Sequence, residues 1–331
     1  MTPARAPIAA TRAVEITVAN LRRKPRAFVP LLQLCGLLCL LWIVFFTLDK
    51  AFPYMRSGAD TIYRAKVKML RGGLDADLVI FGNSKVLSGF VPAQFDRVLQ
   101  THSYNLGLPD EQRFIANLEE LAASGSPPRI VVLTITQVAI DQPTGLFRYL
   151  NNDRAIVDRL FPFRHLPRDM TLFLLRSRTR GGPAMFYRTS GQIIGNVQRD
   201  RGYYFIEGQS HYPGNRIPSD FHLPSDRPDF VNARATLNSS NLTRLRATAD
   251  RYSMQIWFVP SYFRPGEYAP PPSQNHELAD MVRASPRFHL AGPDYWLLPL
   301  ECFADGAHLN PDGAKEYTKR LITLLSAAMT H

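Results

Sequence analysis

Cysteine is scarce in this chain, and its distribution excludes two common ways of stabilising a fold. The 331 residues include three cysteines, and two of them, Cys35 and Cys39, lie within one apolar run, which leaves Cys302 alone in the remainder. A single cysteine cannot form an internal disulfide bond. No cluster of cysteine and histidine has the spacing of a zinc site. We therefore expect an ordinary apolar core, with no metal and no other cofactor.

A concentrated basic surface is also absent from the main part of the chain. The formal net charge is +11, but residues 1–27 supply +5 of it, from six basic residues and one acid, Glu15. The remaining +6 is spread along the rest of the sequence. No zinc-finger, helix-turn-helix or single-strand-binding motif accompanies it. The sequence therefore predicts no nucleic-acid binding.

One long hydrophobic run is present near the N-terminus. Residues 28–48 form 21 consecutive residues without a charge. As a helix, with a rise of about 1.5 Å per residue, the run would span roughly 30 Å, the thickness of a bilayer core. It exceeds the apolar region of about 7–15 residues in a cleaved signal peptide and lacks a small-x-small end. The basic cluster at 22–26 favours a cytoplasmic N-terminus. We expect a cytoplasmic tail over 1–27 and a single-pass anchor over 28–48 in the inner (cytoplasmic) membrane, with the rest of the chain periplasmic or otherwise extracytoplasmic.

Beyond a juxtamembrane linker over 49–76, which contains a helical segment at 59–71, apolar strands alternate with helices. Continuous apolar strands separated by helices predict a parallel sheet covered on both faces. Strands are expected at 77–81, 103–106, 129–135, 255–259 and 287–290, and helices at 110–124, 229–251 and from Pro311 onward. Residues 141–228 interrupt this domain, which spans 77–331, with proline-rich basic sequence and a helix near 169–177. We interpret them as an insertion that is either a lid or substrate platform, or an ordinary surface excursion.

Three polar side chains fall where such a sheet would form a site. Ser84 follows the first strand, and Asp305 and His308 lie in the loop before the last helix. Sites in parallel sheets form in loops at the carboxyl ends of the strands. A hydroxyl, a base and a carboxylate that orients the base are the groups that nucleophilic acyl transfer requires. The Asp-x-x-His spacing allows the carboxylate to reach one imidazole nitrogen while the other nitrogen faces Ser84.

These segments resemble the sequence blocks of the SGNH (GDSL-type) hydrolases. Phe81-Gly82-Asn83-Ser84 resembles the first block, with Asn83 at the usual aspartate position, Tyr104-Asn105-Leu106-Gly107 resembles the second, and Asp305 to Asn310 resembles the last, with the family's following helix and glycine at Gly313. The resemblance implies a three-layer, flavodoxin-like (SGNH-type) α/β fold with Ser84, Asp305 and His308 as the catalytic triad. It also implies an oxyanion hole made by the N–H groups of Ser84 and Gly107. The third block is missing, and Gln137 is the candidate replacement donor.

The anchor, the divergent third block and the insertion resemble one branch of that family. Its members are membrane-anchored proteins of bacterial envelope assembly, as in alginate acetylation and teichoic-acid D-alanylation. The resemblance implies an extracytoplasmic O-acyl transferase or esterase, with acetyl the favoured group, which acts on a cell-envelope polysaccharide beside an integral-membrane acyltransferase partner. Two alternatives stay open. A catalytically degenerate SGNH-like scaffold that binds glycan in a polysaccharide-export complex is favoured by the missing block. A lipase or lysophospholipase is favoured by closeness to the membrane.

Overall fold

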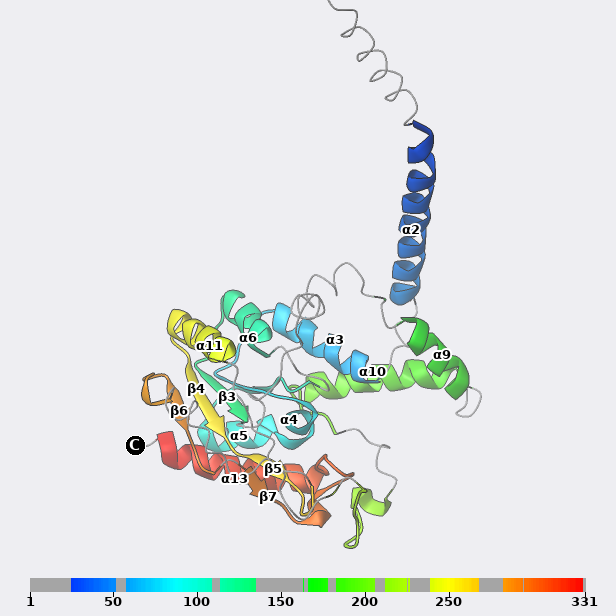
Figure 1. The fold of residues 1–331 in the computed structure, drawn as a ribbon. Coiled ribbons are helices and arrows are strands. Elements are labelled where there is room, and N and C mark those ends of the chain that lie inside the picture. The colour runs from blue at the N-terminus through cyan, green and yellow to red at the C-terminus, as the bar shows by residue number, and fades with distance from the viewer. Residues whose placement is uncertain are drawn as a thin grey trace, which may run out of the picture.

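The computed structural model has an α/β domain built on a five-stranded sheet, with one long N-terminal helix projecting from it (Figure 1). The structure describes residues 25–51, 58–108, 114–134, 163, 166–177, 183–205, 212–224, 226, 239–267, 282–293 and 295–329. The predicted helical residues 110–113 and 229–238, and Gln137, lie outside these ranges.

The main sheet is parallel throughout. Its strand order is β2-β1-β3-β4-β6, and each neighbouring pair runs in the same direction. The strands are β1 (Leu78–Phe81), β2 (Ser103–Asn105), β3 (Ile130–Thr134), β4 (Gln255–Val259) and β6 (Phe288–Leu290). A separate two-stranded parallel sheet is formed by β5 (Ser261–Phe263) and β7 (Tyr295–Leu297). All five strands of the main sheet fall within the segments predicted from apolar runs.

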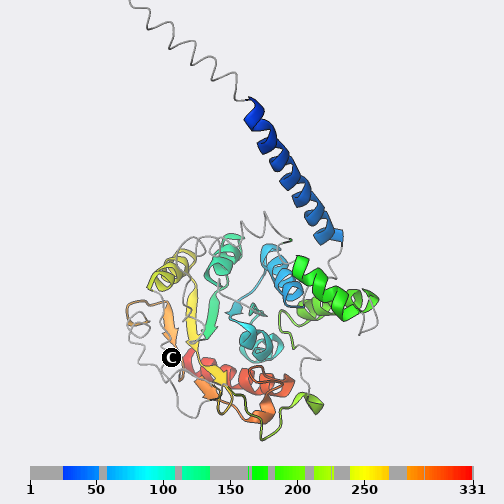
Figure 2. The same ribbon diagram turned by 45° about the vertical axis from the view of Figure 1, so that its right-hand side comes forward.

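Helices cover both faces of the sheet, and the predicted α/β layering is confirmed (Figure 2). Successive side chains of a strand point to opposite faces. Val79 and Phe81 therefore belong to one apolar cluster and Leu78 and Ile80 to the other. The first cluster includes residues of α3 (Gly58–Arg71), α6 (Phe114–Ala123) and α11 (Ser239–Tyr252), and the second includes residues of α4 (Ser84–Gly89), α5 (Pro92–Leu99) and α13 (Pro311–Met329).

Helix α3, which lies in the segment predicted as a juxtamembrane linker, is packed into the domain. Ile62 and Leu70 are each 1% exposed. Ile62 packs against Ile193 and Val197 of α10 (Pro183–Arg199), so α3 is covered by part of the insertion. The sequence pattern does not predict α10, whose glycines lower its helix propensity. Burial of its apolar face against α3 supplies the missing stabilisation.

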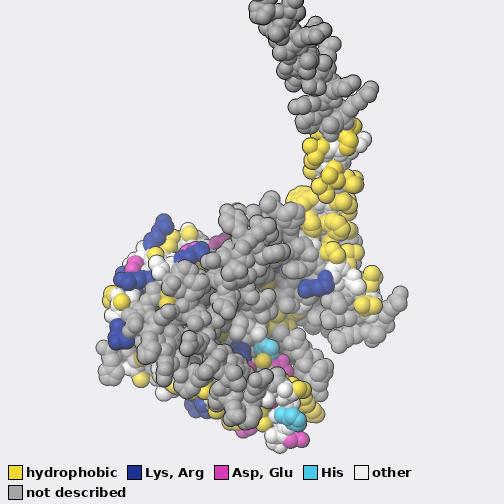
Figure 3. All heavy atoms as spheres, in the orientation of Figure 1, with side chains coloured by type: hydrophobic (Ala, Val, Ile, Leu, Met, Phe, Trp, Pro, Cys, Tyr) yellow, Lys and Arg dark blue, Asp and Glu magenta, His cyan; other side chains and the backbone are white. Residues whose placement is uncertain are grey.

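The long helix α2 (Pro25–Ala51) carries a stretch over 29–51 that is long and apolar enough to cross a membrane. Figure 3 shows hydrophobic side chains along it down to its junction with the domain. Near that junction, Asp49 lies 3.6 Å from the Arg64 guanidinium of α3. Trp42 packs edge-on against Phe163, with ring centroids 6.1 Å apart. The base of the helix is therefore in contact with both α3 and the insertion.

Candidate active site

The nucleophile candidate stands on a tight turn between β1 and α4. Ser84 is the first residue of α4, and Asn83 is its N-cap, accepting a hydrogen bond at Oδ1 from the Lys85 N–H (2.9 Å). A side chain at Gly82 would collide with Val86, because a Cβ there would lie 2.2 Å from a Val86 methyl. Glycine therefore allows the helix to start directly behind the strand. An asparagine oxygen caps as an aspartate oxygen would, so the departure from the family residue at position 83 preserves the turn.

The acid–base candidates lie on a short loop that is closed at both ends. Phe303 and Leu309 form an antiparallel bridge, and the Ala304 N–H donates to the His308 carbonyl (2.9 Å). Asn310 then accepts from the Gly313 N–H at Oδ1 (2.8 Å), as expected for the helix start predicted at Asn310-Pro311. A Cβ at Gly313 would lie 2.1 Å from the Cys302 carbonyl oxygen, so this close approach requires glycine.

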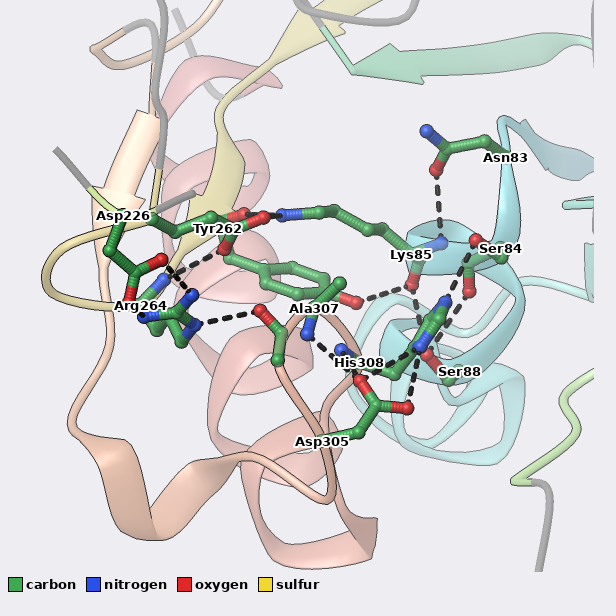
Figure 4. A network of polar contacts seen from close by, with 12 residues as sticks. Asn83, Ser84, Lys85, Ser88, Asp226, Tyr262, Arg264, Asp305, Ala307 and His308 are labelled. Carbon is green, nitrogen blue, oxygen red and sulfur yellow. Dashed lines mark hydrogen bonds and ion pairs between the residues drawn. The ribbon is translucent and has the colours of Figure 1, made fainter. Parts of the chain in front are cut away.

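Ser84, His308 and Asp305 form a continuous hydrogen-bonded relay (Figure 4). His308 Nε2 lies 2.9 Å from Ser84 Oγ, and His308 Nδ1 lies 2.9 Å from Asp305 Oδ2. Asp305 Oδ1 also accepts from the N–H groups of Ala307 and His308, each at 2.8 Å. Burial alone would raise the pKa of the Asp305 carboxyl, but these hydrogen bonds and the imidazole outweigh it and hold the pKa below its ordinary value. The carboxylate is therefore ionised and fixed on one side of the imidazole.

The predicted oxyanion donors differ in their availability. The Ser84 N–H belongs to the first turn of α4, and among the described residues it has no acceptor. The Gly107 N–H donates to Asn105 Oδ1 (2.9 Å), so it would have to leave that bond to reach an oxyanion. Gln137 lies outside the described residues. One of the three predicted donors is thus free in the described part of the chain.

Asn105, which the sequence analysis treated only as part of a motif, supports the nucleophile helix. It is fully buried at the end of β2, and its Nδ2 donates to the carbonyls of Val86 (2.7 Å) and Phe90 (2.9 Å). These carbonyls lie in and just after the last turn of α4, and the Val86 carbonyl also accepts from the Phe90 N–H. The buried ammonium of Lys66 on α3 donates to Asn105 Oδ1 (3.3 Å) and to the Gly107 carbonyl. Helix α3 and strand β2 together fix the position of α4.

Lys85, the residue after Ser84, is mostly buried beside the site. Its ammonium lies 2.5 Å from Glu267 Oε1 and 4.0 Å from the centroid of the Phe263 ring. Burial lowers the pKa of Lys85, although Glu267 acts in the opposite direction. In Figure 4 the side chain points away from His308 and toward the segment after β5. Lys85 therefore ties the nucleophile turn to that segment.

The segment after β5 also contacts the loop that carries Asp305 and His308, through Arg264. This arginine is 1% exposed, and its Nε donates to the Gly306 carbonyl (2.8 Å) between Asp305 and His308. Its two terminal nitrogens both donate to the carboxylate of Asp226, Nη1 at 2.8 Å and Nη2 to the other oxygen. Leu223 covers the loop, because a Cβ at Gly306 would lie 2.8 Å from it. Sequence reasoning missed this cluster because Asp226 and Gly306 are 38 and 42 residues from Arg264, with no local pattern to join them.

Comparisons with protein-family models, with curated proteins and with solved structures found no match. In the described part of the chain, no group of three or more histidine, cysteine, aspartate or glutamate side chains could hold a metal ion. The geometry of the site is that of a serine hydroxyl beside a base that is held by a carboxylate.

Proposed function

We propose that this chain is a membrane-anchored SGNH-type serine acyltransferase or esterase. The observation that carries the proposal is the relay from Ser84 through His308 to Asp305, with both contacts at 2.9 Å. A relay of this kind positions a hydroxyl for attack and supplies the base that accepts its proton. Ser84 and His308 are 224 residues apart in the sequence, so their contact does not follow from proximity along the chain.

In the proposed mechanism, Ser84 Oγ attacks the carbonyl carbon of an acyl ester while His308 Nε2 takes the hydroxyl proton. Collapse of the tetrahedral intermediate breaks the ester bond, and His308 returns the proton to the leaving alkoxide. An incoming hydroxyl then gives its proton to His308 and attacks the acyl-serine. Collapse of the second tetrahedral intermediate breaks the acyl–Oγ bond, and His308 returns the proton to Ser84 Oγ. Asp305 stabilises the imidazolium in both halves. The Ser84 N–H would donate to the developing oxyanion.

The arrangement of the sheet supports the flavodoxin-like (SGNH-type) assignment. Counted along the main sheet, the strand order is 2-1-3-4-5, which is the flavodoxin-like order. In sheets of this order ligands bind beyond the carboxyl ends of the strands, where neighbouring strands connect in opposite directions. Strand β1 lies between β2 and β3, and Ser84 follows it.

The proposed substrate is an O-acyl ester, with acetyl favoured, on a cell-envelope polysaccharide outside the cytoplasmic membrane. The support is the anchor helix with its basic N-terminal flank and the resemblance to envelope acyl-transfer proteins. An integral-membrane acyltransferase is the proposed partner, and a sugar hydroxyl or water would resolve the acyl-enzyme.

The proposal is tested by labelling the full chain, purified in detergent, with a serine-directed fluorophosphonate. Ser84→Ala should abolish labelling and hydrolysis of p-nitrophenyl acetate. Ser124→Ala is the matched control, because Ser124 is exposed and bonds the Leu121 carbonyl far from the site. Labelling that is unchanged in Ser84→Ala would show that another residue is the nucleophile.

The second candidate is a catalytically degenerate scaffold that binds glycan. The observation that favours it is the Gly107 N–H, which is already bonded to Asn105. Loss of one oxyanion donor typically costs about 10²–10³ in rate. Calorimetric titration with acetylated polysaccharide separates the two functions. Binding that is equal in wild type and Ser84→Ala, with no ester cleavage by wild type, would favour the scaffold.

A further inference from the structure

The insertion presents an exposed apolar surface beside the base of the anchor helix. Helix α9 (Leu166–Ser177) turns Leu166 and Phe173 inward, where they are 3% and 6% exposed. Its neighbouring residues Leu174 and Leu175 are 60% and 62% exposed. In Figures 1 and 2, α9 begins next to the lower end of α2 and runs on from it toward α10. The helix therefore carries large apolar side chains on its outer side as well as on the side that packs against the domain.

Contacts of Phe163 with α2 place the start of α9 near the end of the anchor. The Phe163 ring, shortly before α9, packs against Trp42 and Phe45, with centroids 6.1 and 5.7 Å apart. The uncharged run continues to Leu48. With about 1.5 Å of rise per residue, Phe45 and Trp42 lie roughly 5 and 9 Å inside the end of that run. Interfacial helices bury their apolar side about 5–10 Å into the boundary between headgroups and acyl chains.

We propose that α9 is an interfacial helix whose exposed leucines lie in the lipid of the bilayer that holds the anchor. This inference rests on the membrane anchoring within the proposed function and adds a second membrane contact to it. Two leucines are too small a patch for a stable protein interface, which buries about 800 Å² per partner. The contact would limit rotation of the domain about the anchor and so set the side of the site that faces the membrane.

The test places one environment-sensitive fluorophore at a time on the full chain in lipid nanodiscs. In a background with the native cysteines replaced by serine, the label is attached at Leu175→Cys or at Val98→Cys. Val98 is the matched control, because it is a helical apolar residue with a similar exposure of 58%. A third sample keeps native Cys39 as the only cysteine and reports on the anchor itself. Nitroxide-bearing lipids added to the nanodiscs quench only a label that touches lipid.

The expected result is a blue-shifted emission with strong loss of intensity on adding nitroxide lipid at positions 39 and 175, and neither effect at position 98. Quenching at 39 without quenching at 175 would overturn the interfacial helix and leave the anchor intact. An unquenched label at 39 would overturn the anchor and this inference together. A label at 175 that is blue-shifted but not quenched would mean that protein covers α9, which also overturns the proposal.

Discussion

Arg264→Met should weaken both the fold and the candidate active site, because the guanidinium joins a buried ion pair to the loop that carries Asp305 and His308. The substitution removes the bonds from Arg264 to Asp226 and to the Gly306 carbonyl. Methionine fills a similar length of side chain, so the change isolates the polar contacts from the packing. The Asp226 carboxylate then loses its partner in a site where its side chain is 14% exposed.

The expected loss of unfolding free energy is about 3 kcal/mol, the low end of the range for removing one partner of a buried ion pair. The low end applies because Asp226 is partly open to water. Release of the Gly306 carbonyl should also reduce fluorophosphonate labelling about 10-fold or more, since a shift of a catalytic group by 1 Å can cost about 10²-fold. Arg264→Lys keeps the charge without the planar fork and should fall between methionine and wild type.

Urea unfolding in detergent, followed by tryptophan fluorescence, measures the first effect, and labelling rate below the transition measures the second. Arg216→Met is the matched control, because the Arg216–Asp312 pair has a similar distance of 2.9 Å but side chains that are 57% and 62% exposed. The control should change stability by less than about 0.5 kcal/mol. In a double-mutant cycle with Asp226→Asn, the coupling should be about 1–3 kcal/mol. An Arg264→Met variant as stable and as reactive as the control would refute the reasoning.

Three further predictions concern the support of the site and its acid sensitivity. Asn105→Ala should lower the unfolding free energy by about 1–3 kcal/mol, since the Phe90 carbonyl loses its donor while the Val86 carbonyl keeps the Phe90 N–H, and a midpoint shift within error in urea would contradict this role. Asn83→Asp should leave stability and labelling close to wild type because either side chain caps α4, whereas Asn83→Ala should cost about 1 kcal/mol; equal midpoints for the two variants would exclude the cap. The pKa of Asp226 is held low chiefly by its bond to Arg264, so its contribution to stability is present above the ordinary value of 3.8 and is lost as the pH falls below it. Asp226→Asn should therefore differ from wild type at pH 6 and converge with it in strong acid, and a difference independent of pH would be inconsistent with this linkage.

Local pattern was sufficient to predict most of the elements that build the sheet. Continuous apolar runs such as 130–133, rich in β-branched residues, indicate a strand that is buried on both faces. The cap at Asn310 with Pro311 marks a helix start without reference to its surroundings. The pattern failed for α10, whose helix depends on burial against α3. Nor does any local pattern indicate that Glu267 neutralises Lys85.

For the site, the sequence by itself determined the chemical groups and their order: a serine after the first strand, and an aspartate and a histidine three residues apart before the last helix. These are local facts, since turn, cap and spacing are properties of neighbouring residues. Only the tertiary structure decided that Ser84 and His308 meet. It also decided that the Asn105 side chain bonds both α4 and the Gly107 N–H, and that Arg264 bonds the loop that carries Asp305 and His308. These contacts join segments far apart in the chain, and their geometry follows from the register of the parallel strands and the packing of helices on them, which no local sequence pattern encodes.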